Sequence, residues 1–232
     1  MAYKLVSFDV WDTLLRLDTM LEAIAEGISR VSGVDIEKCM AIVYGVREKI
    51  REYRRLGSLS VYELISLSRE LIAEHLGVDL EIVYRGIARG VLDVEVEELV
   101  YSDARDTLKK IKEKGVRVIV LANVMIWPSP YTRLLLEKTG LSNYIDRQYY
   151  ADEIGYYKPL KEAFYKPLRD YGVEPCDAVH VGDSVVEDYN GALEAGLTAI
   201  RVDRGMDGVV KKCDRGYIVS SLKHVVDIVF QE

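Results

Sequence analysis

Apolar positions along the chain follow different periods in different segments, and each period predicts one kind of structure. Residues 3–8 form a short apolar run, which is typical of a buried strand. Residues from 18 to about 92 keep a helical spacing and contain no clear strand. This spacing is seen at Met20, Leu21, Ile24, Ile28 and Val31. From residue 103 onward, short apolar runs alternate with segments of helical spacing.

The alternating part of the chain predicts a parallel β-sheet with helices on both faces. After the first strand, strands are predicted at 116–121, 148–151, 178–181, 197–202 and 217–219. Helices are predicted at 103–114, 130–139, 161–171, 186–195 and once more near the C-terminus. We therefore expect a Rossmann-like α/β core of residues 1–16 and 96–232, with a helical segment, residues 17–95, inserted after the first strand.

Composition and charge exclude several function classes. The chain has 232 residues, of which 49% are hydrophobic and 30% charged, as in soluble globular proteins. The net charge of -7 and the dispersed basic residues disfavour nucleic-acid binding. No apolar stretch approaches the length that spans a membrane. Because a strand is predicted almost at the N-terminus, we expect no signal peptide and a cytoplasmic location. We also expect a monomer or a homodimer.

An acidic residue, Asp9, directly follows the first predicted strand, in the stretch FDVWDTLL of residues 8–15. Open α/β sheets bind their ligands at the carboxyl ends of the strands. A carboxylate at such a place can attack phosphorus and form an aspartyl-phosphate, which divides a difficult hydrolysis into two steps. The alternative is a carboxylate that only caps the loop after the strand.

A longer polar motif follows the predicted strand 178–181. Residues 179–196 read VHVGDSVVEDYNGALEAG, with acidic side chains at Asp183 and Asp188. Mg²⁺ binds a few carboxylates together with water and substrate phosphate, and Asp9 with Asp183 can supply these carboxylates. A helix N-cap at Asp183 or Ser184 is the simpler interpretation, but it accounts for only part of the motif.

Four segments resemble, in chain order, the four signatures of the haloacid dehalogenase-like (HAD) hydrolase superfamily. They are residues 8–15, the strand 116–121 with Ala122 and Asn123, GYYKP at 155–159, and residues 179–196. The resemblance implies a HAD-like core with a helical cap. It also implies a Mg²⁺-dependent hydrolase that acts on a small phosphomonoester through an aspartyl-phosphate at Asp9.

The resemblance also implies a role for each matched residue. Asp9 would be the nucleophile and a metal ligand, and Lys158 would pair with Asp9 and with the phosphoryl oxygens. Asp183 would ligate Mg²⁺, and Asp188 would ligate it or orient its waters. The backbone carbonyl of Trp11 would be a further metal ligand.

Two positions depart from the phosphatase pattern. Trp11 stands where these enzymes have a second Asp as general acid and base, and an indole cannot do this work. Asp12 could replace that acid, or it could bond to backbone amides of the loop. Ala122 replaces a phosphate-binding hydroxyl, and Asn123 could donate to an anion or serve as a turn residue. Thr13 is expected to brace the loop by hydrogen bonding. We assign the substrate- and phosphate-binding positions to Trp11, Thr13, Asn123 and Ser184.

Two other functions remain open at this point. Haloacid dehalogenases carry an aromatic residue at the position of Trp11, which suggests a 2-haloacid dehalogenase-like hydrolase. Such enzymes need no metal and lack the acidic pair Asp183 and Asp188. A catalytically weak regulatory protein that binds phosphate or metal is the second alternative. The expected partner in the leading interpretation is a small phosphorylated molecule.

Overall fold

The computed structural model describes residues 3–57 and 59–230, which form two compact units. The core unit comprises the chain up to Leu15, Val100–Asn123, and the chain from Leu136 onward. The helical unit comprises Arg16–Leu99 and Val124–Leu135. The second of these segments lies outside the predicted insertion and includes the first part of α7 (Ser129–Lys138).

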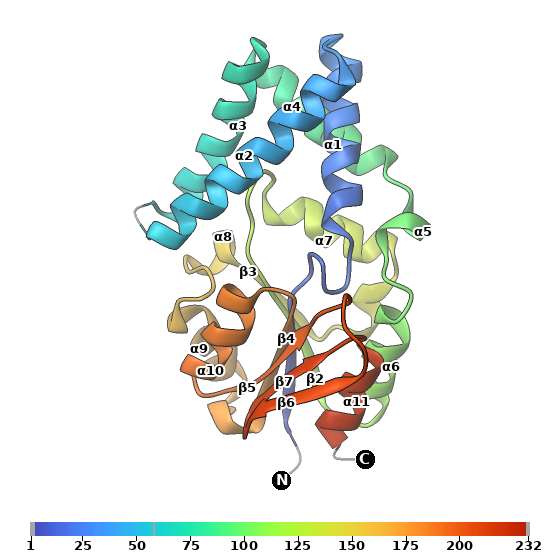
Figure 1. Ribbon diagram of the computed structural model, residues 1–232, viewed down its shortest axis with the longest axis vertical. Helices are drawn as coiled ribbons and strands as arrows, with labels where there is room; N and C mark the ends of the chain where they lie inside the picture. Colours follow the sequence, from blue (N-terminus) through green and yellow to red (C-terminus); the bar gives the residue numbers. More distant parts are fainter. Residues whose placement is uncertain (1–2, 58, 231–232) are drawn as a thin grey trace. The chain divides into compact units, whose positions relative to one another are not determined.

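The core unit is built on one seven-stranded sheet, in the order β3-β2-β1-β4-β5-β7-β6 (Figure 1). All neighbouring strands are parallel except β6 and β7, which are antiparallel. The strands are β1 (Leu5–Phe8), β2 (Arg117–Ala122), β3 (Arg147–Tyr150), β4 (Ala178–Gly182), β5 (Thr198–Val202), β6 (Val209–Cys213) and β7 (Gly216–Val219). This mostly parallel sheet confirms the predicted fold class.

Helices cover both faces of this sheet. In Figure 1, α9 and α10 lie on one face, and α6 and α11 lie on the other. Aromatic and aliphatic side chains of α9 pack on the strands in a fully buried cluster that includes Leu5, Tyr149 and Phe164. The helices of the core unit are α6 (Ala104–Glu113), α8 (Ala151–Ile154), α9 (Lys161–Tyr171), α10 (Gly191–Glu194), α11 (Lys223–Phe230) and the short η1 (Leu141–Tyr144) and η2 (Pro175–Asp177).

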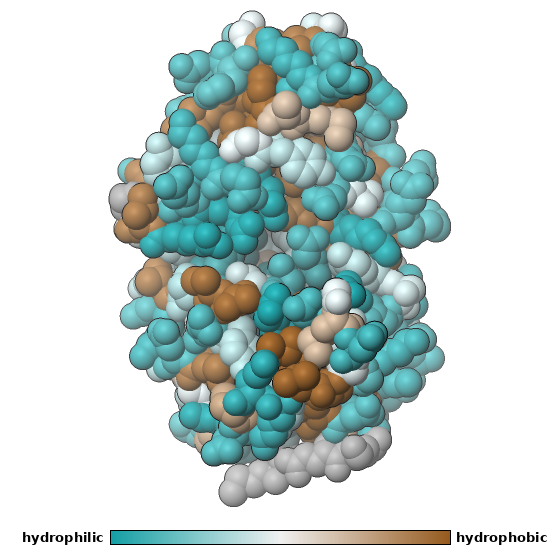
Figure 2. All heavy atoms as spheres, viewed as in Figure 1, coloured by the Kyte–Doolittle hydropathy of each residue, from teal (hydrophilic) through white to brown (hydrophobic). Residues whose placement is uncertain are grey.

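Besides the short helices α8, η1 and η2, which were not predicted, two elements of the core unit differ from the prediction. The helix expected at 186–195 is a π-helix, η3 (Val185–Asn190), which continues into α10. Strand β6 was not predicted, because all five of its residues are exposed and carry no buried apolar face. It forms by pairing with β7 at the edge of the sheet. The face of the protein shown in Figure 2 is mostly hydrophilic with scattered apolar side chains, as is usual for a protein surface.

The helical unit contains α1 (Leu17–Ser32), α2 (Ile36–Leu56), α3 (Val61–Leu76), α4 (Leu80–Asp93) and α5 (Val96–Leu99). Helix α1 packs so closely against α4 that a Cβ atom on Gly27 would lie 2.2 Å from the carbonyl oxygen of Gly86. Ser60 is the N-cap of α3 and forms a capping box with Glu63. The N–H of Glu63 donates to the Ser60 hydroxyl, and the N–H of Ser60 donates to the Glu63 carboxylate. Within the described residues, no helix is long and apolar enough to cross a membrane.

Candidate active site

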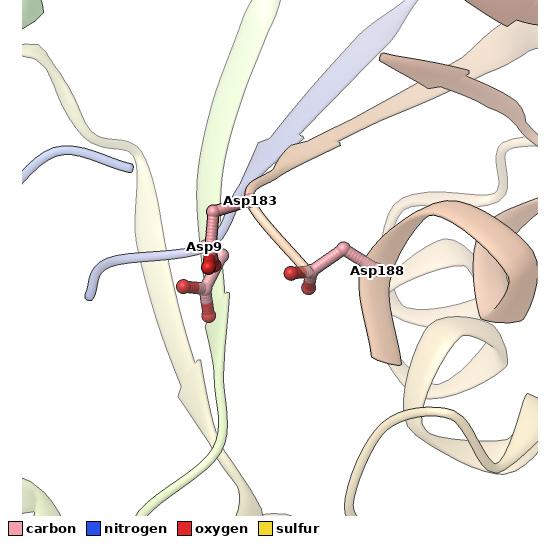
Figure 3. Close-up of side chains that lie close together, drawn as sticks. All are labelled: Asp9, Asp183 and Asp188. Atoms are coloured by element: carbon pink, nitrogen blue, oxygen red, sulfur yellow. The ribbon is translucent and has the colours of Figure 1, made fainter. Parts of the chain in front are cut away.

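Three carboxylates from separate segments of the core unit meet at the carboxyl end of the sheet (Figure 3). Asp9 follows β1, Asp183 follows β4, and Asp188 lies on η3. Because β1 and β4 are adjacent parallel strands, their carboxyl ends lie side by side. Each carboxylate offers one oxygen, and these oxygens lie within 4.8 Å of one another.

Lys158 is buried between these carboxylates. Its ammonium donates to Asp9 Oδ1, to Asp188 Oδ1 and to the backbone carbonyl of Leu121, each at 2.7 Å. The side chain is only 1% exposed, and all three ammonium protons have an acceptor. The nucleophile candidate and the lysine that the family resemblance pairs with it are therefore in direct contact.

The carboxylates carry more negative charge than the single lysine can neutralise. Burial raises the pKa of Asp9 to about 7, despite the opposing charge of Lys158. Burial, together with the charges of Asp188, Asp9 and Asp12, raises the pKa of Asp183 to about 8. Burial alone would raise the pKa of Asp188, but the charge of Lys158 and a hydrogen bond from His180 lower it instead. A site that disfavours its own anions in this way suits a cation.

His180 on β4 contacts the same cluster from inside the sheet. Its Nε2 lies 3.0 Å from Asp188 Oδ1, and its Nδ1 lies 3.0 Å from the hydroxyl of Ser7 on β1. Burial and the charge of Lys158 lower the pKa of His180 to about 4, so the imidazole is neutral at physiological pH. The sequence analysis did not assign Ser7 or His180 to the site. The only indication in the sequence was that Ser7 and His180 are polar residues within the otherwise apolar runs of β1 and β4.

Asn123 follows β2 and binds the backbone of Lys158. Its amide nitrogen donates to the Lys158 carbonyl at 3.0 Å, and its amide oxygen accepts from the Lys158 N–H at 2.9 Å. The same nitrogen lies 3.4 Å from Glu187 Oε2, a buried acid on η3 that the sequence analysis did not assign to the site. The predicted anion donor therefore already has protein partners at both ends of its amide.

The loop after β1 is a tight turn held by backbone hydrogen bonds. The N–H groups of Leu14 and Leu15 donate to the Val10 carbonyl, and Asp12 N–H donates to the Leu15 carbonyl. Asp12 has a φ of 60°, in the left-handed region that Asp tolerates better than most residues. Its charge acts on Asp183, so its side chain belongs to the same electrostatic cluster. Trp11 is half-buried and forms a β-bridge with Leu15.

Thr13 contradicts the expectation, whereas Ser184 forms the helix N-cap that was the simpler interpretation of its motif. Thr13 is fully buried, and its hydroxyl has no hydrogen-bond partner within the described part of the chain, so the expected bracing by this hydroxyl was wrong. Its carbonyl instead accepts from Arg204 at 3.1 Å. The hydroxyl of Ser184 accepts from Glu187 N–H at 3.2 Å and caps η3, and its N–H donates to Asp188 Oδ2 at 3.0 Å.

Comparisons with known proteins identify the family of this chain. Residues 3–196 match the family of haloacid dehalogenase-like hydrolases. The chain belongs to this family. It is 28% identical to human haloacid dehalogenase-like hydrolase domain-containing protein 3, over 96% of this chain and 92% of that protein. It is 26% identical to a glyceraldehyde 3-phosphate phosphatase of Methanopyrus kandleri, over 87% and 84% of the two chains.

The same fold occurs in a solved structure of this family. The magnesium-bound HAD-hydrolase YfnB from Bacillus subtilis superimposes with a TM-score of 0.77 over 99% of both chains, at 17% identity. At this identity the likeness establishes the fold alone. Together with the family match, it makes the protein a HAD-type hydrolase with an α/β core.

Proposed function

We propose that this HAD hydrolase is a Mg²⁺-dependent phosphatase that acts on a small phosphomonoester through an aspartyl-phosphate at Asp9. The observation that carries the proposal is the position of Lys158, whose ammonium lies 2.7 Å from both Asp9 and Asp188 next to Asp183. Relatives that are named as phosphatases, such as the Methanopyrus enzyme, support a phosphatase over other hydrolases.

The residues present fit a magnesium ion. Asp9, Asp183 and Asp188 offer hard oxygen ligands within 4.8 Å of one another. Burial is the main cause of the raised pKa values of Asp9 and Asp183, and a bound cation would offset the cost of keeping these groups ionised. The backbone carbonyl of Trp11 is a further oxygen from the same loop. A bound Mg²⁺ would neutralise charge on the phosphoryl oxygens and on the carboxylates around them.

The chain's own residues account for the first half of the reaction. An Asp9 oxygen forms a bond to phosphorus while the ester P–O bond breaks, and the alcohol oxygen leaves with the bonding electron pair. Lys158 favours the ionised form of Asp9 against the opposing effect of burial, and it offsets the charge of the transferring phosphoryl group. In the second half, a water oxygen attacks the same phosphorus, which releases phosphate and restores the Asp9 carboxylate.

Proton transfer is assigned to Asp12. The leaving oxygen needs a proton, and the attacking water must lose one. The Trp11 side chain can neither supply the first proton nor accept the second. Asp12 carries a carboxylate one residue further along the loop, and its charge already acts on Asp183. A phosphatase without a dedicated acid and base would lose about 10²–10⁴-fold in rate. In this proposal the helical segment 17–95 acts as the cap that selects the substrate.

A dehalogenase-like hydrolase is the second candidate, because Trp11 places an aromatic residue where haloacid dehalogenases have one. That chemistry needs a nucleophilic carboxylate but no metal. The cluster of the three carboxylates Asp9, Asp183 and Asp188, which suits a metal, therefore favours phosphoryl transfer over dehalogenation.

The test is phosphate release from a panel of phosphomonoesters and an activated aryl phosphate, with Mg²⁺ or with EDTA. We expect release that depends on Mg²⁺ and is lost in Asp9→Asn. A matched control is Asp177→Asn, since Asp177 precedes the opposite end of β4 and pairs with Lys4. Metal-independent release of halide from 2-haloacids would support the second candidate instead. Mg²⁺ binding without any turnover would support a regulatory binding protein.

A further inference from the structure

A chain of buried polar groups connects β1 to the carboxylate cluster. Ser7 is 2% exposed and His180 is 1% exposed, and the two residues are paired in the parallel register of β1 and β4. The Ser7 hydroxyl lies 3.0 Å from His180 Nδ1, and His180 Nε2 lies 3.0 Å from Asp188 Oδ1. A polar group so deeply buried is normally hydrogen-bonded, and here each of these bonds leads toward the site.

The direction of each hydrogen bond follows from the chemistry of its end points. The Asp188 carboxylate only accepts hydrogen bonds, so the ring proton of His180 is placed on Nε2, which donates to it. Nδ1 then carries a lone pair and accepts from the Ser7 hydroxyl. The Asp188 carboxylate therefore selects the tautomer, and the Ser7 hydroxyl holds the ring in the orientation in which His180 donates to Asp188.

Asp188 is held from three directions. Oδ1 accepts from both His180 and Lys158, and Oδ2 accepts from the N–H of Ser184. The carboxylate also fills the space beside Gly182, where an added Cβ atom would lie 2.2 Å from Asp188 Cγ. Loss of the His180 donor would leave one side of Asp188 without its hydrogen bond, and Lys158 depends on Asp188 for one of its three acceptors.

We propose that His180, oriented by Ser7, is a positioning residue that fixes Asp188 and thereby the ammonium of Lys158 against Asp9. This role rests on the proposed phosphatase function. The simpler alternative is a packing role, since the His180 ring makes an edge-on contact with Phe164 at a centroid distance of 5.2 Å. The two roles differ in which substitutions restore activity, because a packing role needs only volume and a positioning role needs a donor.

The experiment compares His180→Gln, which retains an N–H donor, with His180→Leu, which retains volume alone. We expect His180→Leu to lower kcat about 10–100-fold, as expected when a charged acceptor loses its hydrogen bond, with a much smaller change in KM. We expect His180→Gln to recover most of that loss. Ser7→Ala should lower kcat by a smaller factor, and adding it to His180→Leu should cause no further loss, because both act through one chain.

The control is Thr198→Val on β5, because Thr198 is equally buried and its hydroxyl pairs with Tyr3 at 3.0 Å. This variant removes a partly buried hydrogen bond of a neighbouring strand, so it should lower the melting temperature without a comparable loss of kcat. The positioning role is overturned if His180→Gln and His180→Leu lose equal activity in step with their melting temperatures. Should His180→Leu fail to fold, Ser7→Ala with a kcat equal to that of the starting protein would overturn it as well.

Calorimetric titration with Mg²⁺ separates this inference from the phosphatase proposal. If the unsubstituted protein hydrolyses none of the esters, the proposed function fails, but the metal affinity still reports on Asp188. We then expect weaker Mg²⁺ binding in His180→Leu and near-normal binding in His180→Gln. Equal Mg²⁺ affinity in both variants and in the unsubstituted protein would refute the positioning role.

Discussion

Acidification should weaken Mg²⁺ binding through the two carboxyl groups whose pKa values are raised. In the metal-free site, the pKa of Asp9 is about 7 and that of Asp183 is about 8, in each case mainly because of burial. A cation can bind these oxygens only after the protons leave, so each pH unit below a pKa weakens the apparent affinity about tenfold per group. Between about pH 9 and about pH 6, the combined loss of affinity is therefore about 10³-fold.

The sign of this effect follows from the direction of both shifts. Raised pKa values mean that the metal-free folded protein holds protons that the unfolded chain, with ordinary carboxyl groups, releases near pH 4. These two groups therefore stabilise the metal-free fold below about pH 4 relative to higher pH, and that contribution is lost as the pH rises through about 7 and 8. Added Mg²⁺ should accordingly raise the melting temperature most at high pH.

Isothermal titration calorimetry at about pH 6, 7.5 and 9 measures the affinity, and buffers of different ionisation enthalpy measure the released protons. Asp183→Asn should bind Mg²⁺ more weakly and release one proton fewer near pH 6. Asp177→Asn, at the other end of β4, should behave like the unsubstituted protein. An affinity that is the same at about pH 6 and about pH 9 would refute the argument, as would an unchanged proton release in Asp183→Asn.

Four further predictions concern the loop after β2, two helical glycines and proton transfer. Asn123→Leu removes both hydrogen bonds to the backbone of Lys158, and under the proposed function it should lower kcat about 10–100-fold in the phosphate-release assay. Gly86→Ala should destabilise the protein by about 1–3 kcal/mol in chemical denaturation, because the added Cβ atom would lie 2.6 Å from a backbone atom of α1. Gly45→Ala in α2 should instead stabilise the protein by about 0.5–1 kcal/mol, because no described atom beyond the chain neighbours and the surrounding backbone of α2 lies within 4 Å of the added Cβ. Trp11→Asp should add a second acid beside Asp12 and speed hydrolysis of esters with poor leaving groups more than of an activated aryl phosphate, up to about 10²-fold. Equal effects on both substrates would contradict the argument that proton transfer limits turnover.

The sheet could be predicted from the sequence because its central strands are buried on both faces. The runs that became β1, β2, β4 and β5 are almost continuously apolar, and a buried strand needs no other signal. Strand β6 could not be predicted, since its five exposed residues gain their conformation only from pairing with β7. The apolar spacing of residues 186–195 predicts a helix, but it does not distinguish the π-helix η3 from an α-helix.

The sequence predicts which site residues lie at the ends of neighbouring strands, but it does not predict the directions of their side chains. A polar residue after a parallel strand must lie at the carboxyl edge of the sheet, so Asp9, Asp183 and Asn123 were expected near one another. Nothing in the sequence indicates that Asn123 turns toward the Lys158 backbone. Nor does it indicate that the Thr13 hydroxyl stays buried without a partner in the described part of the chain.

The loop after β1 explains how tryptophan can replace an acid without disturbing the nucleophile. The turn depends on backbone groups, since the Val10 carbonyl accepts two N–H groups and the Leu15 carbonyl accepts a third. None of these bonds uses the side chain of Trp11. Asp9, in contrast, is held through its side chain by Lys158. In the proposed reaction, attack on phosphorus therefore does not depend on the side chain at position 11. Under the proposed function, the leaving group of the substrate therefore decides how strongly turnover depends on Asp12.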